Sequence, residues 1–348
     1  MDPGPGQRIA VVGAGPAGGF LARALALAGV EVDLYDPSHP REKPCGGVLS
    51  AEALRYVPEA AALPSANRLT HLAVHTPFGH RFQQPQSRPS IAVDRRELDG
   101  SLLDGAVRAG ARHIHDRVLA VELAGPQPRL RTRHGERPYD LIVGADGVHS
   151  LVARAAGLAP EPHQLGHMEG GWGPPLGDPG TLVLHFGALL GYAWVINRAG
   201  RSSVGMVGRL LDRTRIQAAF QAFLAERQLS AASLSPYRWA IPFSNDVFQL
   251  EQPRCGPGWL LVGDAAGFCD PLTAQGIHLA LASAWAAAAA ILSGKPASYD
   301  NRWRDLFGAN LYFGVRHRDL LGSRPMTETM LRSLERNPGL GHNFFKTI

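Results

Sequence analysis

The chain has 348 residues, 45% of them hydrophobic, so it can bury a large core and we expect two lobes. The net charge of +5 includes no basic block interleaved with aromatic residues, which argues against nucleic-acid binding and leaves open a weak attraction to an anionic membrane surface. Cys45, Cys255 and Cys269 show no disulfide or zinc spacing, and the 14 histidines form no metal-binding pattern. Because no signal-peptide pattern is present either, we expect a cytoplasmic protein, with peripheral contact to the inner membrane face left open.

A nucleotide-binding unit is predicted at the amino terminus. An apolar strand leads into the motif GAGPAG at 13–18, and a helix rich in Ala and Leu follows. Gly13 allows a tight turn, Gly15 lets backbone N–H groups approach a pyrophosphate, and Gly18 lets the helix pack against the strand. The next strand ends at Asp36, about 20 residues past the glycines, where an acid binds the ribose hydroxyls of an adenosine and disfavours a 2′-phosphate.

The rest of the chain alternates between elements of this nucleotide fold and a different kind of sheet. Short alternating runs over 181–210 predict an antiparallel sheet, whereas the stretch 160–180, rich in Gly and Pro, predicts a crossover loop. A second glycine signature, GDAAG at 263–267, follows an apolar strand and returns the chain to the first lobe. The expected elements are strands at 8–12, 30–36, 117–123, 139–147, 181–186, 192–196, 203–207, 237–241 and 259–264, helices at 17–28, 93–108, 212–227 and 277–292, and hairpin tips at 125–138 and 197–201.

The predicted fold class is therefore α/β. We expect a discontinuous Rossmann-like FAD-binding lobe, because the two glycine signatures in this order indicate FAD, with an inserted antiparallel β-sheet lobe for the substrate and a short helical carboxyl-terminal region. The apolar run at 277–292 is too short to span a membrane and predicts a buried helix. The expected segments are 1–68, 91–160 and 246–295 for the FAD-binding lobe, 69–90 and 161–245 for the substrate lobe, and 296–348 for the helical region.

Three fingerprints together resemble the FAD-dependent monooxygenase superfamily that shares the para-hydroxybenzoate hydroxylase fold. They are the first glycine motif with its distal acid, the sequence Ala145-Asp146-Gly147, and Gly263-Asp264. Within that superfamily the chain is most similar to the geranylgeranyl reductase family, because PREKPCGG at 40–47 resembles its PxxxxCGG motif and 263–277 carries its second pattern. The family's pocket motif YxWxFP is present only in part, as YAWVIN at 192–197, and the carboxyl-terminal region is short, so the length of the substrate stays open.

The resemblance implies contacts with FAD from several segments of the chain. Asp264 would accept hydrogen bonds from the ribityl hydroxyls, and the amino terminus of the helix at Gly276-Ile277 would stabilise the reduced pyrimidine ring. Arg95 would lie beside the phosphates. The expected cofactor-binding residues are Gly13, Gly15, Pro16, Ala17, Gly18, Asp36, Cys45, Gly46, Gly47, Arg95, Val118, Ala145, Asp146, Gly147, Gly263, Asp264, Pro271, Gly276 and Ile277.

The candidate catalytic residues are Cys45, Gly46 and Gly47, because the resemblance places this loop against the isoalloxazine ring. A thiol there could donate a proton to a carbon or gate the flavin environment; the alternative is an inert, half-buried cysteine, since no partner base is visible. Tyr192 and Trp194 share one face of a strand and are candidate substrate-pocket residues, with core packing as the alternative. Cys269 is expected to be structural.

The predicted activity is the transfer of a hydride from reduced flavin N5 to a carbon–carbon double bond of an apolar, isoprenoid-like substrate. The alternatives are hydroxylation of an aromatic or polyene substrate after reduced flavin reacts with oxygen, and an electron-carrying flavoprotein that acts with a partner. A halogenase would need a catalytic lysine, and Lys43, Lys295 and Lys346 are not clearly placed for it. Because no second GxGxxG follows the first, the electron donor would be docked NAD(P)H or a ferredoxin-type protein.

Overall fold

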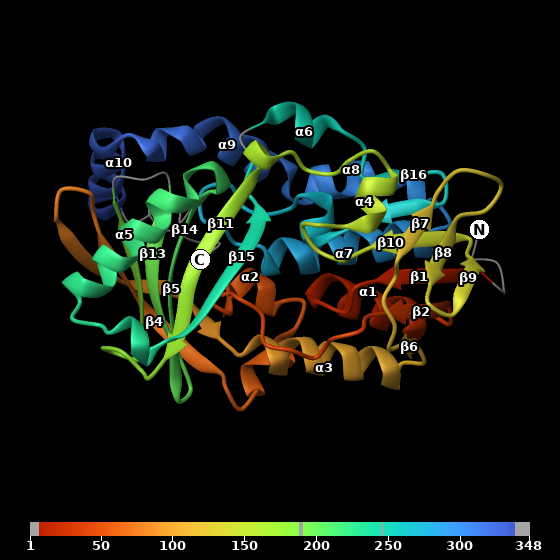
Figure 1. Cartoon of the computed structure of the whole chain (residues 1–348), viewed down its shortest axis with the longest axis horizontal. Helices are drawn as coiled ribbons and strands as arrows, with labels where there is room; N and C mark the ends of the chain where they lie inside the picture. Colours follow the sequence, from red (N-terminus) through yellow and green to blue (C-terminus); the bar gives the residue numbers. More distant parts are fainter. Residues whose placement is uncertain (1–6, 188–190, 245, 338–348) are drawn as a thin grey trace.

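Two large sheets form the frame of the protein in the computed structural model, which describes residues 7–187, 191–244 and 246–337 (Figure 1). The strands of the first sheet, in order across it, are β16 (Cys255–Gly256), β17 (Trp259–Leu261), β10 (Leu141–Gly144), β1 (Arg8–Val12), β2 (Glu31–Tyr35) and β6 (Arg112–Ile114). All neighbours are parallel except β16 and β17. Strands that are far apart in the sequence lie side by side, so the lobe is discontinuous, as predicted.

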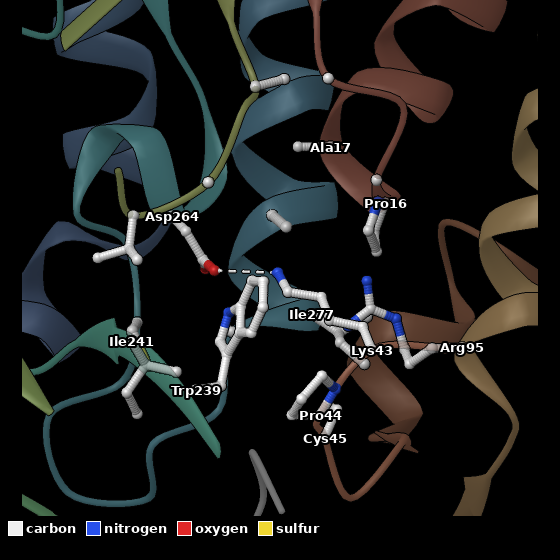
Figure 2. A pocket seen from close by; sticks show the side chains of 18 of the residues that line it. Pro16, Ala17, Lys43, Pro44, Cys45, Arg95, Trp239, Ile241, Asp264 and Ile277 are labelled. Carbon is white, nitrogen blue, oxygen red and sulfur yellow. Dashed lines mark ion pairs between the residues drawn. The ribbon is translucent and has the colours of Figure 1, made fainter. Parts of the chain in front are cut away.

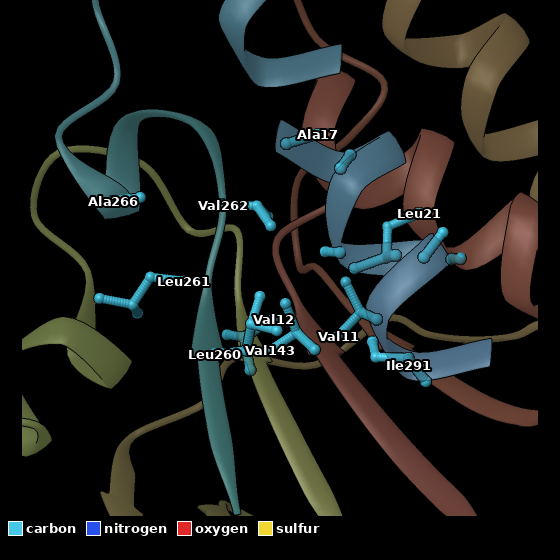
Figure 3. Packing of buried hydrophobic residues seen from close by; sticks show 14 of the residues in the cluster. Val11, Val12, Ala17, Leu21, Val143, Leu260, Leu261, Val262, Ala266 and Ile291 are labelled. Atoms are coloured by element: carbon cyan, nitrogen blue, oxygen red, sulfur yellow. The ribbon is translucent and has the colours of Figure 1, made fainter. Parts of the chain in front are cut away.

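Small side chains allow the helices to pack closely on this sheet. Helix α1 (Pro16–Leu27) packs against both α3 (Arg95–Arg108) and α7 (Ile277–Leu292). Half of the residues of α7 are alanine and most of the helix is buried, so its backbone can approach α1 at short range. Figure 3 shows side chains of β1, β10 and β17 packed with Leu21 of α1 and Ile291 of α7. Helix α7 is the buried helix that was expected, and none of the described helices is long and apolar enough to cross a membrane.

The second sheet has eight strands. In order they are β15 (Ser235–Pro242), β11 (Leu165–Gly173), β14 (Arg201–Arg209), β13 (Gly191–Arg198), β12 (Thr181–Phe186), β4 (Asn67–His75), β5 (Arg81–Ala92) and β3 (Val48–Leu49). The predicted antiparallel pairing is found throughout, except that β12 and β4 are parallel. Helix α5 (Arg213–Glu226) covers one face, where Phe220 and Phe223 pack against Ala193 and Val195 of β13. The alternate positions Tyr192 and Trp194 therefore face the other side of the sheet.

The predicted crossover loop at 160–180 is wrong over its middle, where β11 forms an interior strand of the second sheet, between β15 and β14. Four of the nine residues of β11 are glycine, a residue that is depleted in strands because it has no side chain to pack. The neighbours explain the composition. A Cβ on Gly170 would lie 2.6 Å from the Tyr237 ring and one on Gly171 would lie 2.8 Å from Leu234, so larger residues would not fit.

The predicted hairpin tip at 125–138 is also wrong, because most of it forms strands. β7 (Ala120–Glu122), β8 (Arg129–Thr132) and β9 (Gly135–Pro138) make a small antiparallel sheet whose last turn is at Arg133-His134. Arginine and proline obscured this pattern because β9 is exposed on both faces and has no apolar alternation. The expected tip at 197–201 is narrower, since β13 and β14 pair up to Arg198 and Arg201.

The carboxyl-terminal region is helical, as predicted. The structure also has the short helices α2 (Ala51–Leu54), α4 (Leu151–Ala155) and α6 (Val247–Glu251). Its last described elements include α8 (Tyr299–Trp303), the π-helical turn η7 (Arg304–Gly308), α9 (Ala309–His317) and α10 (Arg324–Arg336). These last helices run along one edge of the molecule, and α10 packs Leu331 and Leu334 against the large sheet (Figure 1). Lys346 lies outside the described residues, as do residues 1–6 of the first expected segment and 338–348 of the last. The boundaries of the expected segments stay predictions.

A pair of histidines lies between the large sheet and α5. His75 of β4 and His185 of β12 are register partners, and their rings are 5.3 Å apart. The Arg227 guanidinium lies 3.4 Å from Nδ1 of His75 and 3.3 Å from Nδ1 of His185, so both imidazoles accept from it only when neutral. Burial, then Arg227 and the second histidine, lower the pKa of His75 to about 4, and burial and Arg227 also lower the pKa of His185.

We expect the free energy of unfolding to decrease as the pH falls below about 6.5, because the unfolded chain protonates these two histidines before the folded chain does. The loss should amount to roughly 1–3 kcal/mol once solvent screening is allowed for. Urea unfolding at several pH values measures it, with the double variant His75→Gln, His185→Gln as the comparison. If the unfolding free energies of both proteins depended equally on pH, this explanation would be wrong.

Candidate functional site

A cavity of about 450 Å³ lies at the carboxyl ends of β1, β2, β10 and β17 and extends to the face of the large sheet. In parallel α/β sheets this edge is where ligands bind. On one side the cavity is lined by the first glycine motif, residues 145–149, Asp264 and the start of α7 (Figure 2). On the other side it is lined by the loop at 37–47 and by side chains of the large sheet.

The first glycine motif has the geometry that its sequence predicts. Gly13 has φ of +100°, and a Cβ on it would lie 2.4 Å from the carbonyl oxygen of Ala145. A Cβ on Gly18 would lie 1.8 Å from the carbonyl oxygen of Gly13, so α1 packs directly on the turn. By contrast, a Cβ on Gly15 would meet only His39 Nε2, at 4.0 Å, and the backbone of Gly15 is therefore open to the cavity.

Asp36 begins a buried chain of charged groups along the wall of the cavity. Its carboxylate accepts from the Ala14 N–H at 3.0 Å and pairs with His39 Nδ1 at 2.8 Å. His39 Nε2 lies 3.1 Å from Asp99, which accepts two hydrogen bonds from Arg95. Burial would raise the pKa of Asp36, but His39 and the backbone amides hold it well below its usual value. Burial would lower the pKa of His39, but Asp36 and Asp99 outweigh it and raise that pKa, so the cluster is neutral when His39 is protonated.

The other end of this chain reaches Cys45. Arg95 is buried, and Figure 2 shows it on the same side of the cavity as Pro44 and Cys45. Burial alone would lower the pKa of Arg95, but Asp99 and then the Cys45 thiol raise it. Cys45 Sγ also accepts from the Gly47 N–H at 3.3 Å. The half-buried thiol thus has a cation and a backbone donor beside it.

Lys43 reaches across the cavity. Its Nζ lies 3.6 Å from Asp264 Oδ2, the ion pair drawn in Figure 2, and 5.5 Å from the centre of the Trp239 ring. A Cβ on Gly276, the residue before α7, would lie 3.2 Å from Asp264 Oδ1. Asp264 therefore lies at the amino terminus of α7, where the helix dipole favours negative charge.

The end of the cavity at the large sheet is mainly apolar. Tyr192 and Trp194 both line it, with ring centres 6.1 Å apart, and their polar atoms bond to protein groups: Tyr192 donates to the Thr273 carbonyl and Trp194 to Ser203 Oγ at 3.1 Å. With their polar atoms satisfied, the rings present apolar surface to the cavity. The remaining apolar side chains of this end are Met168, Leu182, Leu184, Ile196, Val207 and Ile241.

Most of the residues that the sequence analysis selected line this one cavity. The exceptions are Gly18, Gly263 and Pro271. Gly18 lies against the turn at Gly13, Gly263 lies between α1 and α7, and Pro271 packs against Gly314 of α9. Cys269, expected to be structural, is buried but also lines the cavity. The predicted residues that do line it are Gly13, Gly15, Pro16, Ala17, Asp36, Cys45, Gly46, Gly47, Arg95, Val118, Ala145, Asp146, Gly147, Tyr192, Trp194, Asp264, Gly276 and Ile277.

Comparison with known proteins agrees with this geometry. Residues 7–227 match the FAD binding domain family. The chain is 31% identical to digeranylgeranylglycerophospholipid reductase 2 of Methanothermobacter thermautotrophicus, over 94% of this chain and 91% of the relative. It is 26% identical to the geranylgeranyl diphosphate reductase of Synechocystis sp., over 80% and 73% of the two chains. The chain belongs to the geranylgeranyl reductase family of FAD-dependent oxidoreductases. The fold is similar to that of a geranylgeranyl bacteriochlorophyll reductase-like protein from Thermoplasma acidophilum, with a TM-score of 0.78, 19% identity, and coverage of 94% and 91%.

The residues around the cavity fit the FAD that this family requires. The backbone at Gly15 and Gly147 is open, since a Cβ on Gly147 would meet nothing within 4 Å. Asp146 Oδ1 is buried and has no hydrogen-bond partner in the described part of the protein, whereas Oδ2 accepts from the Leu151 N–H at 2.8 Å. Burial raises the pKa of Asp146 because it disfavours the charged carboxylate. A hydrogen-bond donor that reaches the free oxygen would offset this cost of burial. Within the same residues no group of acidic, histidine or cysteine side chains is arranged to hold a metal ion.

Sequence reasoning missed several residues of the site. His39 and Asp99 form the charge chain with Asp36 and Arg95, and His39 was detectable only as a neighbour of Asp36. Lys43 was in view within the PREKPCGG motif, but its reach to Asp264 depends on how two distant loops fold. Trp239 lay on a predicted strand, with no signal for which face of that strand would line the cavity.

We expect Asp36→Ala to weaken FAD binding about tenfold or more, because it leaves the Ala14 N–H and His39 without their acceptor; a factor of ten corresponds to about 1.4 kcal/mol. Fluorescence titration of the apoprotein with FAD measures the effect. Asp33→Ala is the matched control, since Asp33 is a buried carboxylate of β2, the strand that leads to Asp36, and pairs with Arg8 and Arg112 instead. The control should lower the melting temperature while FAD affinity stays near that of the wild type. Equal loss of affinity in both variants would contradict a specific role for Asp36.

Proposed function

We propose that this protein reduces isolated carbon–carbon double bonds of a polyprenyl chain. The observation that supports this most is the shape and chemistry of the cavity, which joins a polar cradle at the glycine motifs to an apolar end on the large sheet. Cys45 lies at the junction of the two ends, beside Arg95. The relatives named above act on geranylgeranyl groups, whose unsaturated hydrocarbon chains match an apolar pocket in chemistry.

In this proposal the pyrophosphate of FAD lies over the open backbone at Gly15 and the amino terminus of α1. Asp36 orders the turn that holds the adenosine, and Arg95 provides positive charge near the phosphates. Asp264 would exchange its ion pair with Lys43 for the ribityl hydroxyls, and the first N–H groups of α7, after Gly276, would stabilise negative charge on the reduced ring. Under the same proposal, segments 1–68, 91–160 and 246–295 supply the cofactor lobe.

The bound cofactor supplies a hydride at N5. Cys45, which has Arg95 and the Gly47 N–H beside its sulfur, donates the proton to the second carbon of the double bond and is then reprotonated by solvent. Tyr192 and Trp194 would hold the hydrocarbon chain and exclude water from the reacting carbons. The electron donor in this proposal is NAD(P)H or a ferredoxin-type protein, and an isoprenoid substrate would be collected through peripheral contact with a membrane.

We expect Cys45→Ser to slow substrate reduction by about a hundredfold, because a hydroxyl is a far weaker acid than a thiol at the same position. The measurement is single-turnover oxidation of the chemically reduced protein by a geranylgeranyl alkene under anaerobic conditions. Cys255→Ser is the control, since the Cys255 thiol lies near Asp300 and lines no part of the cavity. Both variants should retain FAD. An unchanged rate in Cys45→Ser would remove the proposed proton donor.

The class of reaction is tested by how the reduced protein responds to oxidants. Slow reoxidation in air combined with fast anaerobic reoxidation by a polyprenyl alkene is the expected result. Fast reoxidation in air coupled to incorporation of oxygen into an aromatic or polyene substrate would instead indicate a hydroxylase. Reoxidation by a protein acceptor, with no response to any alkene, would indicate an electron carrier.

A further inference from the structure

The loop Cys45-Gly46-Gly47 is packed closely enough that a side chain at either glycine would displace neighbouring atoms. A Cβ on Gly46 would lie 2.5 Å from Ile196 Cδ1, and one on Gly47, where φ is +75°, would lie 2.1 Å from the Val93 carbonyl oxygen. The Val93 N–H donates to the Gly47 carbonyl at 2.9 Å. The loop is therefore pressed between β13 of the large sheet and the segment that leads into α3.

Arg198 is the residue of β13 that contacts this loop through polar atoms. It lies two and four positions after Ile196 and Trp194, on the face of the strand that lines the cavity. Its side chain is fully buried; Nη2 donates to the Cys45 carbonyl at 2.6 Å and Nε lies 3.4 Å from the Gly46 carbonyl. Nη1 donates to Glu42 at 2.7 Å and to Asp94 at 2.8 Å. One planar guanidinium thus binds two consecutive carbonyls of the loop and two carboxylates.

Arg201 provides a natural comparison within the same cluster. It pairs with the same two carboxylates, at 3.2 Å to Glu42 and 2.7 Å to Asp94, and its side chain is 33% exposed. Among the described contacts of Arg201 none is to the loop carbonyls. Both arginines therefore neutralise Glu42 and Asp94, whereas of the two only Arg198 donates to the carbonyls of the loop.

We propose that Arg198 is a positioning residue that holds the Cys45–Gly47 loop against the cavity and thereby sets where the Cys45 thiol and the loop backbone meet the flavin. The consequence for the flavin rests on the proposed function, which places this loop beside the ring. Lysine cannot substitute, because its three donors radiate from one atom and cannot span two carbonyls and two carboxylates, although it keeps the charge.

The test is the rate at which iodoacetamide alkylates Cys45 in the folded apoprotein, followed by peptide mass spectrometry with Cys255, which does not line the cavity, as the internal reference. We expect Arg198→Lys to raise the Cys45 rate about tenfold, as the released loop opens more often, while Arg201→Lys stays within about twofold of the wild type. The same pair is compared for FAD affinity and for the absorption spectrum of the bound flavin, which only Arg198→Lys should change.

Three results would overturn the proposal: an unchanged Cys45 rate in Arg198→Lys, an equal rise in Arg201→Lys, or an equal rise at Cys255, which would indicate general loosening. If Arg198→Lys does not fold, Asp94→Asn is measured instead, because it weakens the anchor of Arg198 and leaves its donors in place. A smaller rise at Cys45 supports the proposal and no rise overturns it. Protection of wild-type Cys45 by FAD tests the proposed placement of the loop separately, so failure there leaves the comparison of the two arginines intact.

Discussion

The site depends on a contact between backbones at Gly13, where side chains are excluded. A Cβ on Gly13 would lie 2.4 Å from the Ala145 carbonyl oxygen, and one on Gly18 would lie 1.8 Å from the Gly13 carbonyl oxygen. The turn after β1, the end of β10 and the first turn of α1 therefore meet at van der Waals distance. Without this contact residues 145–147 would not line the same cavity as the first motif. The alanines of α7 have a similar effect, because their small side chains let a helix that is distant in the sequence pack close to this turn.

Two groups of buried or partly buried charges meet at the loop that carries Cys45. One is the chain from Asp36 to Arg95, and the other is the pair of arginines on Glu42 and Asp94. Desolvation of buried ion pairs offsets much of their attraction, so such groups contribute little net stability. We interpret their main effect as geometric, because each charge is compensated only when the loop occupies one position. The Cys45 environment is thus determined by groups from three separate segments, at 36–42, 94–99 and 198–201.

Local patterns predicted the parts of the fold whose signal lies within one stretch of sequence. The apolar strand, the glycine turn and Asp36 were predictable because each is required by its immediate neighbours, and the alanine-rich α7 was predictable from its composition. The strand β11 was not predictable from local patterns, because its glycines are required by contacts with Tyr237 and Leu234, which are more than sixty residues away in the chain. Arg198 was equally hidden, since nothing near it in the sequence distinguishes a hairpin arginine that is exposed from one that binds a distant loop.

The strand β11, which the sequence analysis expected to be a loop, supports the Cys45 loop, where the reaction is proposed to take place. Because Gly170 has no side chain, the Tyr237 ring can lie over β11, and its hydroxyl reaches Ser203 Oγ at 2.9 Å. Ser203 Oγ in turn lies 3.4 Å from the Cys45 carbonyl, beside the contact that Arg198 makes with the same oxygen. A larger residue at Gly170 would displace Tyr237 and remove the support of Ser203 without touching the cavity. The glycines of β11 therefore belong to the architecture of the site as much as those of the first motif do, although they bind nothing themselves.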